Sequence, residues 1–275
     1  MRNSWGFGPL LLALTLLHVG CVEESVPTYR ADSLEKTATA GTRPVASLLG
    51  PVVGVHYLGH AAFILSFDDG VTILMDDGES RTYCHVAPAR DFGTLAPNIV
   101  VYAHPDMARE NWEFPGAEVV SGSDFKRGDV EIRAIPVTED VLDDNYGYLI
   151  SYKGFRIFYA GDSQGDMLAL DRPEVQKRLK NALPDQVDLL LVPIDWKREI
   201  TPQAVSYVDF LRPKRVIPMH YWSSEAKERF LNSLETSRRG YYIIETNAPD
   251  CRIYVTERAN PVEVISLKAG PVVEI

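Results

Sequence analysis

Short apolar runs dominate the chain from residue 50 onward, and most are rich in β-branched residues, which is typical of strands. Asp69-Gly70 and Lys153-Gly154 each separate two such runs and predict tight turns between paired strands. Two later runs are apolar at nearly every position, which favours central strands buried on both faces. The predicted strands are 52–58, 62–67, 71–75, 98–103, 130–137, 146–152, 155–160, 187–192 and 215–218, and the tail 241–275 is strand-like again.

Helical spacing appears only in the second half of the chain. Residues 173–183 form a charged, amphipathic stretch that begins with a proline. Thr201 is expected to cap a second helix that has Pro202 at its first position and ends before Pro213. Ser223 or Ser224 is expected to cap a third helix. Strands followed by alternating helices and strands predict the α/β (α+β) class over residues 50–275, as one large domain or two small ones.

The first twenty residues predict an export signal rather than part of the fold. Their apolar run is too short to span a bilayer and fits a secretory leader. Gly20-Cys21 resembles the cleavage site of a bacterial lipoprotein, so lipidation of Cys21 is expected. The polar stretch 22–48 then serves as a flexible tether. These features predict a protein of the bacterial cell envelope, facing the periplasm or the cell surface, with the membrane as partner through a lipid anchor.

Composition and charge narrow the classes of function. With 45% hydrophobic and 24% charged residues, the chain is not a disordered one. Its formal net charge of −10 disfavours nucleic acid as a partner, because phosphate binding needs clustered Lys and Arg. A small molecule is the expected substrate. In an oxidising compartment Cys84 and Cys251 either form a disulfide or remain two separate thiols.

Candidate chemistry follows directly after three of the predicted strands. His104 and Asp106 come after the strand that ends near Ala103, Asp162 follows 155–160, and His220 follows 215–218. Strand ends are rigid and converge on one edge of a layered fold. Imidazole and carboxylate groups together suit zinc, iron or manganese. The pattern therefore predicts a metal site at a sheet edge.

Several segments in the expected order carry a resemblance to the metallo-β-lactamase superfamily. The chain is most similar to the branch that includes the ascorbate-6-phosphate lactonase and the phospholipase D acting on N-acyl-phosphatidylethanolamine. The resemblance implies a four-layer αββα sandwich with a metal site along one edge of the two sheets. The segments that carry it are Tyr57–Phe63, Thr72–Asp76, Tyr159–Ser163, Leu191–Ile194 and Ile217–Tyr221.

The metal-binding loop departs from the family pattern His-x-His-x-Asp-His. The aligned stretch 102–107 keeps His104 and Asp106 but has Tyr102 and Met107 in place of the outer histidines. A thioether is a poor ligand for such a dication. The resemblance then implies a reduced, mononuclear site, with either one divalent metal, zinc or else manganese or iron, or no metal. The implied metal ligands are His104, Asp106, Asp162 and His220, together with Glu139 or Asp140, while Tyr102 is a weaker candidate.

The resemblance also implies catalytic roles. Asp106 would hold or move a proton, and His60 would lie at the mouth of the site and contact the substrate or the leaving group; the alternative for His60 is a turn histidine bonded to backbone. The predicted function is a metal-dependent hydrolase that activates water against an ester, lactone, amide or phosphodiester. The alternative is a degenerate, metal-free member that binds a ligand or partner. Glu139 turned toward His104 and Asp162 would favour the enzyme, and Arg109 filling the site would favour the binding protein. A structural envelope protein is a third hypothesis.

Overall fold

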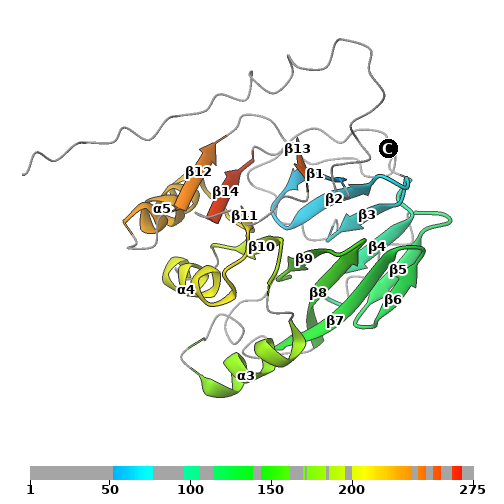
Figure 1. Cartoon of the computed structure of the whole chain (residues 1–275), viewed down its shortest axis with the longest axis horizontal. Coiled ribbons are helices and arrows are strands. Elements are labelled where there is room, and N and C mark those ends of the chain that lie inside the picture. Colours follow the sequence, from blue (N-terminus) through cyan, green and yellow to red (C-terminus); the bar gives the residue numbers. More distant parts are fainter. Residues whose placement is uncertain are drawn as a thin grey trace, which may run out of the picture.

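Two β-sheets packed face to face form the centre of the molecule (Figure 1). The computed structural model describes residues 52–76, 96–105, 114–138, 144–161, 170, 172–183, 186–195, 200–236, 241–245, 250–254 and 262–267. The first sheet has six strands in the order β13-β1-β2-β3-β4-β5. Its strands are β1 (Val52–Gly59), β2 (Ala62–Phe67), β3 (Thr72–Met75), β4 (Ile99–Tyr102), β5 (Glu118–Ser121) and β13 (Asp250–Tyr254).

The second sheet has eight strands in the order β12-β14-β11-β10-β9-β8-β7-β6. Strands β9, β10, β11, β14 and β12 run parallel, whereas β6 to β9 form an antiparallel meander. The strands of this sheet are β6 (Phe125–Arg127), β7 (Val130–Thr138), β8 (Asp144–Tyr152), β9 (Phe155–Tyr159), β10 (Leu189–Pro193), β11 (Arg215–Met219), β12 (Tyr241–Glu245) and β14 (Val262–Ser266).

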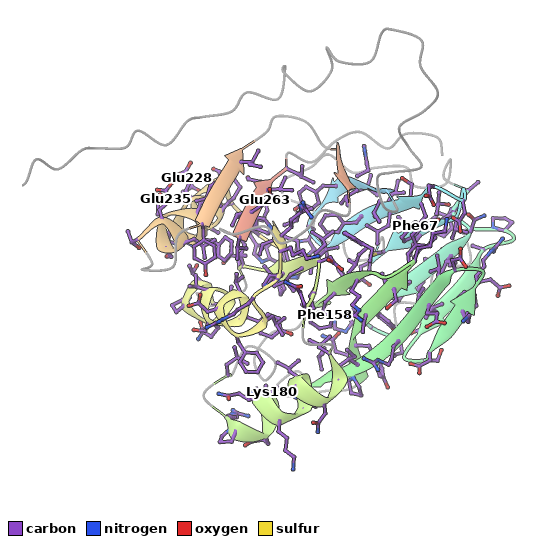
Figure 2. The ribbon with its side chains drawn as sticks, in the orientation of Figure 1. Phe67, Phe158, Lys180, Glu228, Glu235 and Glu263 are labelled. Atoms are coloured by element: carbon purple, nitrogen blue, oxygen red, sulfur yellow. The ribbon has the colours of Figure 1, made fainter. Side chains whose placement is uncertain are left out.

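In the part of the chain that the structure describes, three helices lie on the side of the second sheet that faces away from the first (Figure 1). They are α3 (Pro173–Ala182), α4 (Thr201–Leu211) and α5 (Ser224–Glu235). Phe158 of β9 packs against Tyr207 of α4, with ring centroids 6.3 Å apart, and so joins this layer to the sheet (Figure 2). Glu228 and Glu235 lie on the exposed side of α5 (Figure 2). Among the helices that the structure describes, none is both long and apolar enough to cross a bilayer.

Alternating side chains along each strand build the main core between the sheets. Phe63, Leu65 and Phe67 of β2 belong to it, and the ring of Phe67 lies 4.6 Å from that of Tyr152 in the opposite sheet. The intervening residues of the first sheet form a second cluster on its outer face, which includes Leu58, Ile64, Leu74, Val100 and Tyr102. The residues of this second cluster are buried as well, although Val119 on the edge strand β5 is 54% exposed.

The pattern of short apolar runs predicted most of these elements. Gly70 and the pair Lys153-Gly154 have positive φ and form the predicted turns. Ser223 caps α5, since its Oγ accepts from the N–H of Ala226 at 3.2 Å. The cap predicted for α4 was wrong: Thr201 is already helical and buried, and Ile200 stands at the cap position without a side-chain hydrogen bond. The predicted leader, Cys21 and the tether lie outside the described residues.

Candidate metal centre

The candidate site lies where strand ends of both sheets meet at one edge of the sandwich. The turn between β1 and β2 carries His60, and β11 ends next to His220. The N–H of His220 donates to the carbonyl of His60 at 2.7 Å, so a turn of the first sheet is fastened to a strand end of the second. The hydroxyl of Tyr57 donates to the same carbonyl at 3.1 Å. Two sequence-predicted site residues, 160 positions apart, are therefore in contact.

The imidazole of His220 is held in a defined orientation. The side chain is fully buried, and Nδ1 lies 3.1 Å from the carbonyl oxygen of Asp195, just beyond β10. A carbonyl only accepts, so this hydrogen bond requires the proton on Nδ1, and in the neutral ring the lone pair is then on Nε2. The Asp195 carboxylate accepts from the N–H of Trp222 at 3.3 Å. The segment after β10 therefore fixes both the ring and the backbone that follows it.

Three aromatic rings pack together at this point. The rings of His60 and His220 have centroids 3.9 Å apart, and Trp222 stands edge-on to His60 at 4.9 Å. His60 is 3% exposed and Trp222 is half-buried. Behind them, burial raises the pKa of Tyr221 from its ordinary value, which keeps its hydroxyl protonated. This aromatic cluster, His60, His220 and Trp222, forms one side of the candidate site.

His104 sits on a second anchored segment. It is half-buried and follows Ala103, whose N–H donates to Oδ1 of Asp76 at 2.7 Å and whose carbonyl accepts from the N–H of Tyr146 at 2.9 Å. Asp76 follows β3, is 3% exposed, and its other carboxylate oxygen accepts from the hydroxyl of Tyr159. The residue before His104 is thus held by both sheets.

The segment that leads to Asp162 passes close to Ala103. Gly161 has φ +64, and a Cβ on it would lie 2.7 Å from the carbonyl oxygen of Tyr146 and 3.2 Å from Cβ of Ala103. Only glycine combines this backbone with so close an approach. The residues immediately before His104 and immediately before Asp162 are therefore neighbours.

Unusual backbone conformations gather at this edge. Among the described residues, five that are not glycine have positive φ, and three of them are His60, Asp76 and His220. Such left-handed residues cost of order 1 to 3 kcal/mol each and cluster where function requires a fixed geometry. Their position therefore marks the same edge as the hydrogen bonds do.

Tyr102, the residue at the first histidine of the family motif, lies elsewhere. Its ring is fully buried in the outer-face cluster of the first sheet, with Leu58 and Val100. Its carbonyl accepts from the hydroxyl of Tyr148 at 2.8 Å, and that hydroxyl accepts in turn from the N–H of Gly122. Burial raises the pKa of Tyr148 far above its ordinary value, so the phenol stays a donor. This placement argues against Tyr102 as a metal ligand.

Several predicted site residues fall outside the part of the chain that the structure describes. These are Asp106, Asp162, Glu139 and its alternative Asp140, Arg109, Cys21 and Cys84, while only the backbone of Cys251, in β13, is described. Within the described residues, no group of three His, Cys, Asp or Glu side chains stands ready to hold a metal. The ligand set, the catalytic roles and the pairing of Cys84 with Cys251 stay predictions.

Sequence reasoning missed Asp195 and Trp222. Asp195 follows the apolar strand β10, so the rule that found His104, Asp162 and His220 applies to it equally. Its role was hidden because the backbone carbonyl, rather than the side chain, contacts His220. Trp222 stands two residues after His220, and nothing in the pattern signalled its contact with His60.

The orientation of His220 fits that of a metal ligand. Histidines that bind metals donate the other ring N–H to a carbonyl or carboxylate, which is the arrangement of His220 with Asp195.

A hollow of about 600 Å³ lies elsewhere, between the end of α3 and the outer face of β6 to β9. Its lining includes Arg156, near the start of β9, whereas the candidate site lies beyond the end of that strand.

Comparisons with known proteins agree with the fold. The β-lactamase superfamily domain matches residues 54–220, more than half of the chain, so the chain belongs to that family. A UPF0173 protein of Pyrococcus abyssi is 28% identical over 207 residues, which cover 66% of this chain and 90% of the relative. A UPF0173 metal-dependent hydrolase of Pyrococcus furiosus is 28% identical over 203 residues, which cover 62% and 85%.

A solved structure shows the same fold. It comes from Thermotoga maritima and is assigned to zinc-dependent hydrolases of the metallo-β-lactamase superfamily. It superposes with a TM-score of 0.53 at 18% identity, covering 78% of this chain and 98% of the other. At this identity the likeness establishes the fold alone. The predicted sandwich of metallo-β-lactamase type is thereby confirmed.

Proposed function

We propose that this chain is an exported, lipid-anchored, metal-dependent hydrolase that cleaves an ester, lactone, amide or phosphodiester bond of a small molecule. Membership of the β-lactamase superfamily and relatives named metal-dependent hydrolases support the class of reaction. The apolar run before Cys21 and the polar stretch 22–48 support export and anchoring. The net charge of −10 supports a small substrate rather than a nucleic acid.

The orientation of His220 carries the metal-dependent part of the proposal. Nδ1 is occupied by the Asp195 carbonyl at 3.1 Å, which leaves Nε2 as the nitrogen for a metal. Burial and the contact with Asp195 hold the ring in one orientation, and the backbone bond to His60 fixes the main chain that carries it. Such preorganisation is what a binding site needs, because ordering a ligand on binding costs free energy.

Different residues of the chain would then bind the metal, hold a proton and contact the substrate. His104 and His220 would supply imidazole nitrogens, and the carboxylates of Asp106, Asp162 and Glu139 would supply oxygens and offset the positive charge. When bound, a divalent metal lowers the pKa of a coordinated water and polarises the oxygen of the bond under attack. Asp106 would hold the proton of the attacking water. His60, packed on His220, would contact the substrate or the leaving group.

Metal content of the purified full-length chain tests this proposal. We expect about one zinc, manganese or iron ion per wild-type chain, as a mononuclear site requires, and loss of most of it in His220→Ala. His56→Ala is the matched control, because His56 is also buried but lies on β1 with its neighbours in the first sheet. This control should keep its metal. Elemental mass spectrometry measures both, and circular dichroism checks that each variant is folded.

A screen of esters, lactones, amides and phosphodiesters with the loaded protein then separates hydrolase from binding protein. Turnover that disappears with the metal and in His220→Ala supports the hydrolase. A folded wild-type chain that takes up no zinc, manganese or iron would overturn the proposal and favour the metal-free ligand- or partner-binding protein.

A further inference from the structure

The hydroxyl of Tyr159 lies where three segments of the candidate site meet. Tyr159 is the last residue of β9, is fully buried, and precedes Asp162 by three positions. Its hydroxyl donates to the carboxylate of Asp76 and lies 3.3 Å from the carbonyl oxygen of Ala61, which follows His60. One side chain thus contacts the residue after His60 and the carboxylate that holds the residue before His104, and it stands three positions before Asp162.

We propose that Tyr159 is a positioning residue of the metal site. Its hydroxyl fixes the Asp76 carboxylate, which accepts from the N–H of Ala103 and so sets the position of the backbone at His104. This inference rests on the proposed function, because it concerns how that same site holds its metal. The proposed role of Tyr159 is therefore an indirect one. It acts through Asp76, whose two carboxylate oxygens serve two different segments.

The Asp76 carboxylate is well suited to such a role. It is buried, and buried carboxylates are stable only with good donors around them. Oδ1 accepts from the N–H of Ala103 at 2.7 Å, a short bond to a charged group, and Oδ2 accepts from Tyr159. The backbone of Asp76 is itself constrained, with φ +43 and its N–H donating to the carbonyl of Val101 at 3.0 Å. Removing the Tyr159 hydroxyl would leave Oδ2 without this donor and let the carboxylate turn.

Rotation of the Asp76 carboxylate is expected to change the affinity for the metal more than the stability of the fold. Metal–ligand distances tolerate changes of only about 0.2 Å, and partners behind the ligands typically alter metal affinity 10- to 100-fold. The phenyl ring of Tyr159 supplies the packing in the core between the sheets, and Phe keeps that ring. Tyr159→Phe therefore removes the positioning hydroxyl with little change in packing.

Tyr152 offers a matched control at the opposite end of the sandwich. Its ring is also fully buried between the sheets, and its hydroxyl also donates to an aspartate, Asp68. Asp68 belongs to the turn between β2 and β3, at the opposite end of β2 from His60. Tyr152→Phe is thus the same chemical change without the proposed consequence.

Titration of the metal-free proteins with Co²⁺ tests the inference, because its visible absorption reports coordination independently of turnover. We expect Tyr159→Phe to bind Co²⁺ 10- to 100-fold more weakly than wild type, with altered absorption bands. Tyr152→Phe should match the wild type in affinity and spectrum. Asp76→Asn, which keeps the size of the side chain, should weaken binding as Tyr159→Phe does and serves if the latter fails to fold. Thermal unfolding without metal records the purely structural cost of each change.

The outcomes separate this inference from the proposed function. Wild-type affinity and spectrum in folded Tyr159→Phe would overturn the positioning role and leave the metal-dependent hydrolase intact. Equal weakening in Tyr159→Phe and Tyr152→Phe would also overturn it, since the effect would then follow stability alone. Absence of Co²⁺ binding by the wild type would overturn the metal-dependent function, and the inference with it.

Discussion

The two ends of the sandwich fasten the same two sheets by different means. At the site end the links are buried and directional: His220 to His60, Tyr146 to Ala103, Tyr159 to Asp76. At the far end the turn between β2 and β3 meets the turn between β8 and β9 through Asp68, which accepts from Tyr152 and from Lys153 at 2.9 Å. The charged pair there is open to water, with 38% and 42% of its side chains exposed.

The difference separates holding the sheets together from fixing where atoms lie. An exposed ion pair adds at most about 1 kcal/mol and tolerates movement, since water replaces either partner. A buried hydrogen bond is costly to break, because the donor or acceptor that loses its partner cannot bond to water instead. A site that must hold several metal ligands at fixed positions needs buried hydrogen bonds rather than exposed ion pairs. Paired substitutions at the two ends make this comparison testable.

Substitution of the glycines gives the largest expected contrast. Gly161→Ala places a Cβ 2.7 Å from a backbone oxygen at φ +64, whereas Gly154→Ala has a similar φ of +84 but no atom within 4 Å. We expect Gly161→Ala to lower the free energy of unfolding by about 3 kcal/mol or more and Gly154→Ala by about 1 kcal/mol. Thermal unfolding measures both, and Gly161→Ala should also reduce metal uptake. Equal losses of free energy of unfolding in the two variants would mean that the atoms around Gly161 move apart at little cost.

Removal of tyrosine hydroxyls gives a smaller contrast. In Tyr148→Phe the carbonyl of Tyr102 and the N–H of Gly122 both lose a buried partner at 2.8 Å. We expect a loss of about 2 kcal/mol, against less than about 1 kcal/mol for Tyr152→Phe, whose partner Asp68 is half exposed and regains water. Chemical denaturation at neutral pH compares the two. A larger loss for Tyr152→Phe would reverse the distinction between the ends.

The smallest effect is a pH dependence at the far end. The hydrogen bond from Tyr152, and then that from Lys153, lowers the pKa of Asp68 below its ordinary value. A lowered pKa in the folded state stabilises the protein above the unfolded pKa, near 3.9, and this contribution is lost as the pH falls through the folded value. Relative to Asp68→Asn, the wild type should be more stable by less than about 1 kcal/mol from pH 8 to about 5. The difference should begin to narrow below about pH 4 and close at lower pH. Urea denaturation across this range would record it, and an unchanged difference would exclude the carboxylate as its source.

The sequence pattern predicted strands wherever the apolar run was long enough to be buried. It missed β5 and β6, because these short edge strands carry Glu118 and the pair Lys126-Arg127 on exposed surfaces. The start of α4 was misplaced because Thr201 has the residue type of a cap but is buried. Local chemistry signals an element, whereas burial decides its boundary.

The candidate site was predictable only where the type and position of a side chain indicate metal binding. His104 and His220 follow strands and were found for that reason, whereas His60 was implied by the family resemblance. Asp195 acts through its carbonyl, Trp222 through ring packing and Tyr159 through a residue 83 positions away. Such contacts depend on which strand ends become neighbours, and no spacing along the chain records that.

The pairing of β13 with β1 has a consequence for how the chain folds during synthesis. The first strand of the domain is bonded on one side to residues 250–254, so Val52 faces Tyr254. At roughly 5 to 20 residues per second, a ribosome delivers β13 on the order of ten seconds or more after β1. Until then one edge of β1 is open to strands of other chains. A chain ended after the family match at residue 220 would keep that edge open, and we expect it to aggregate even though its candidate metal-binding residues are all present.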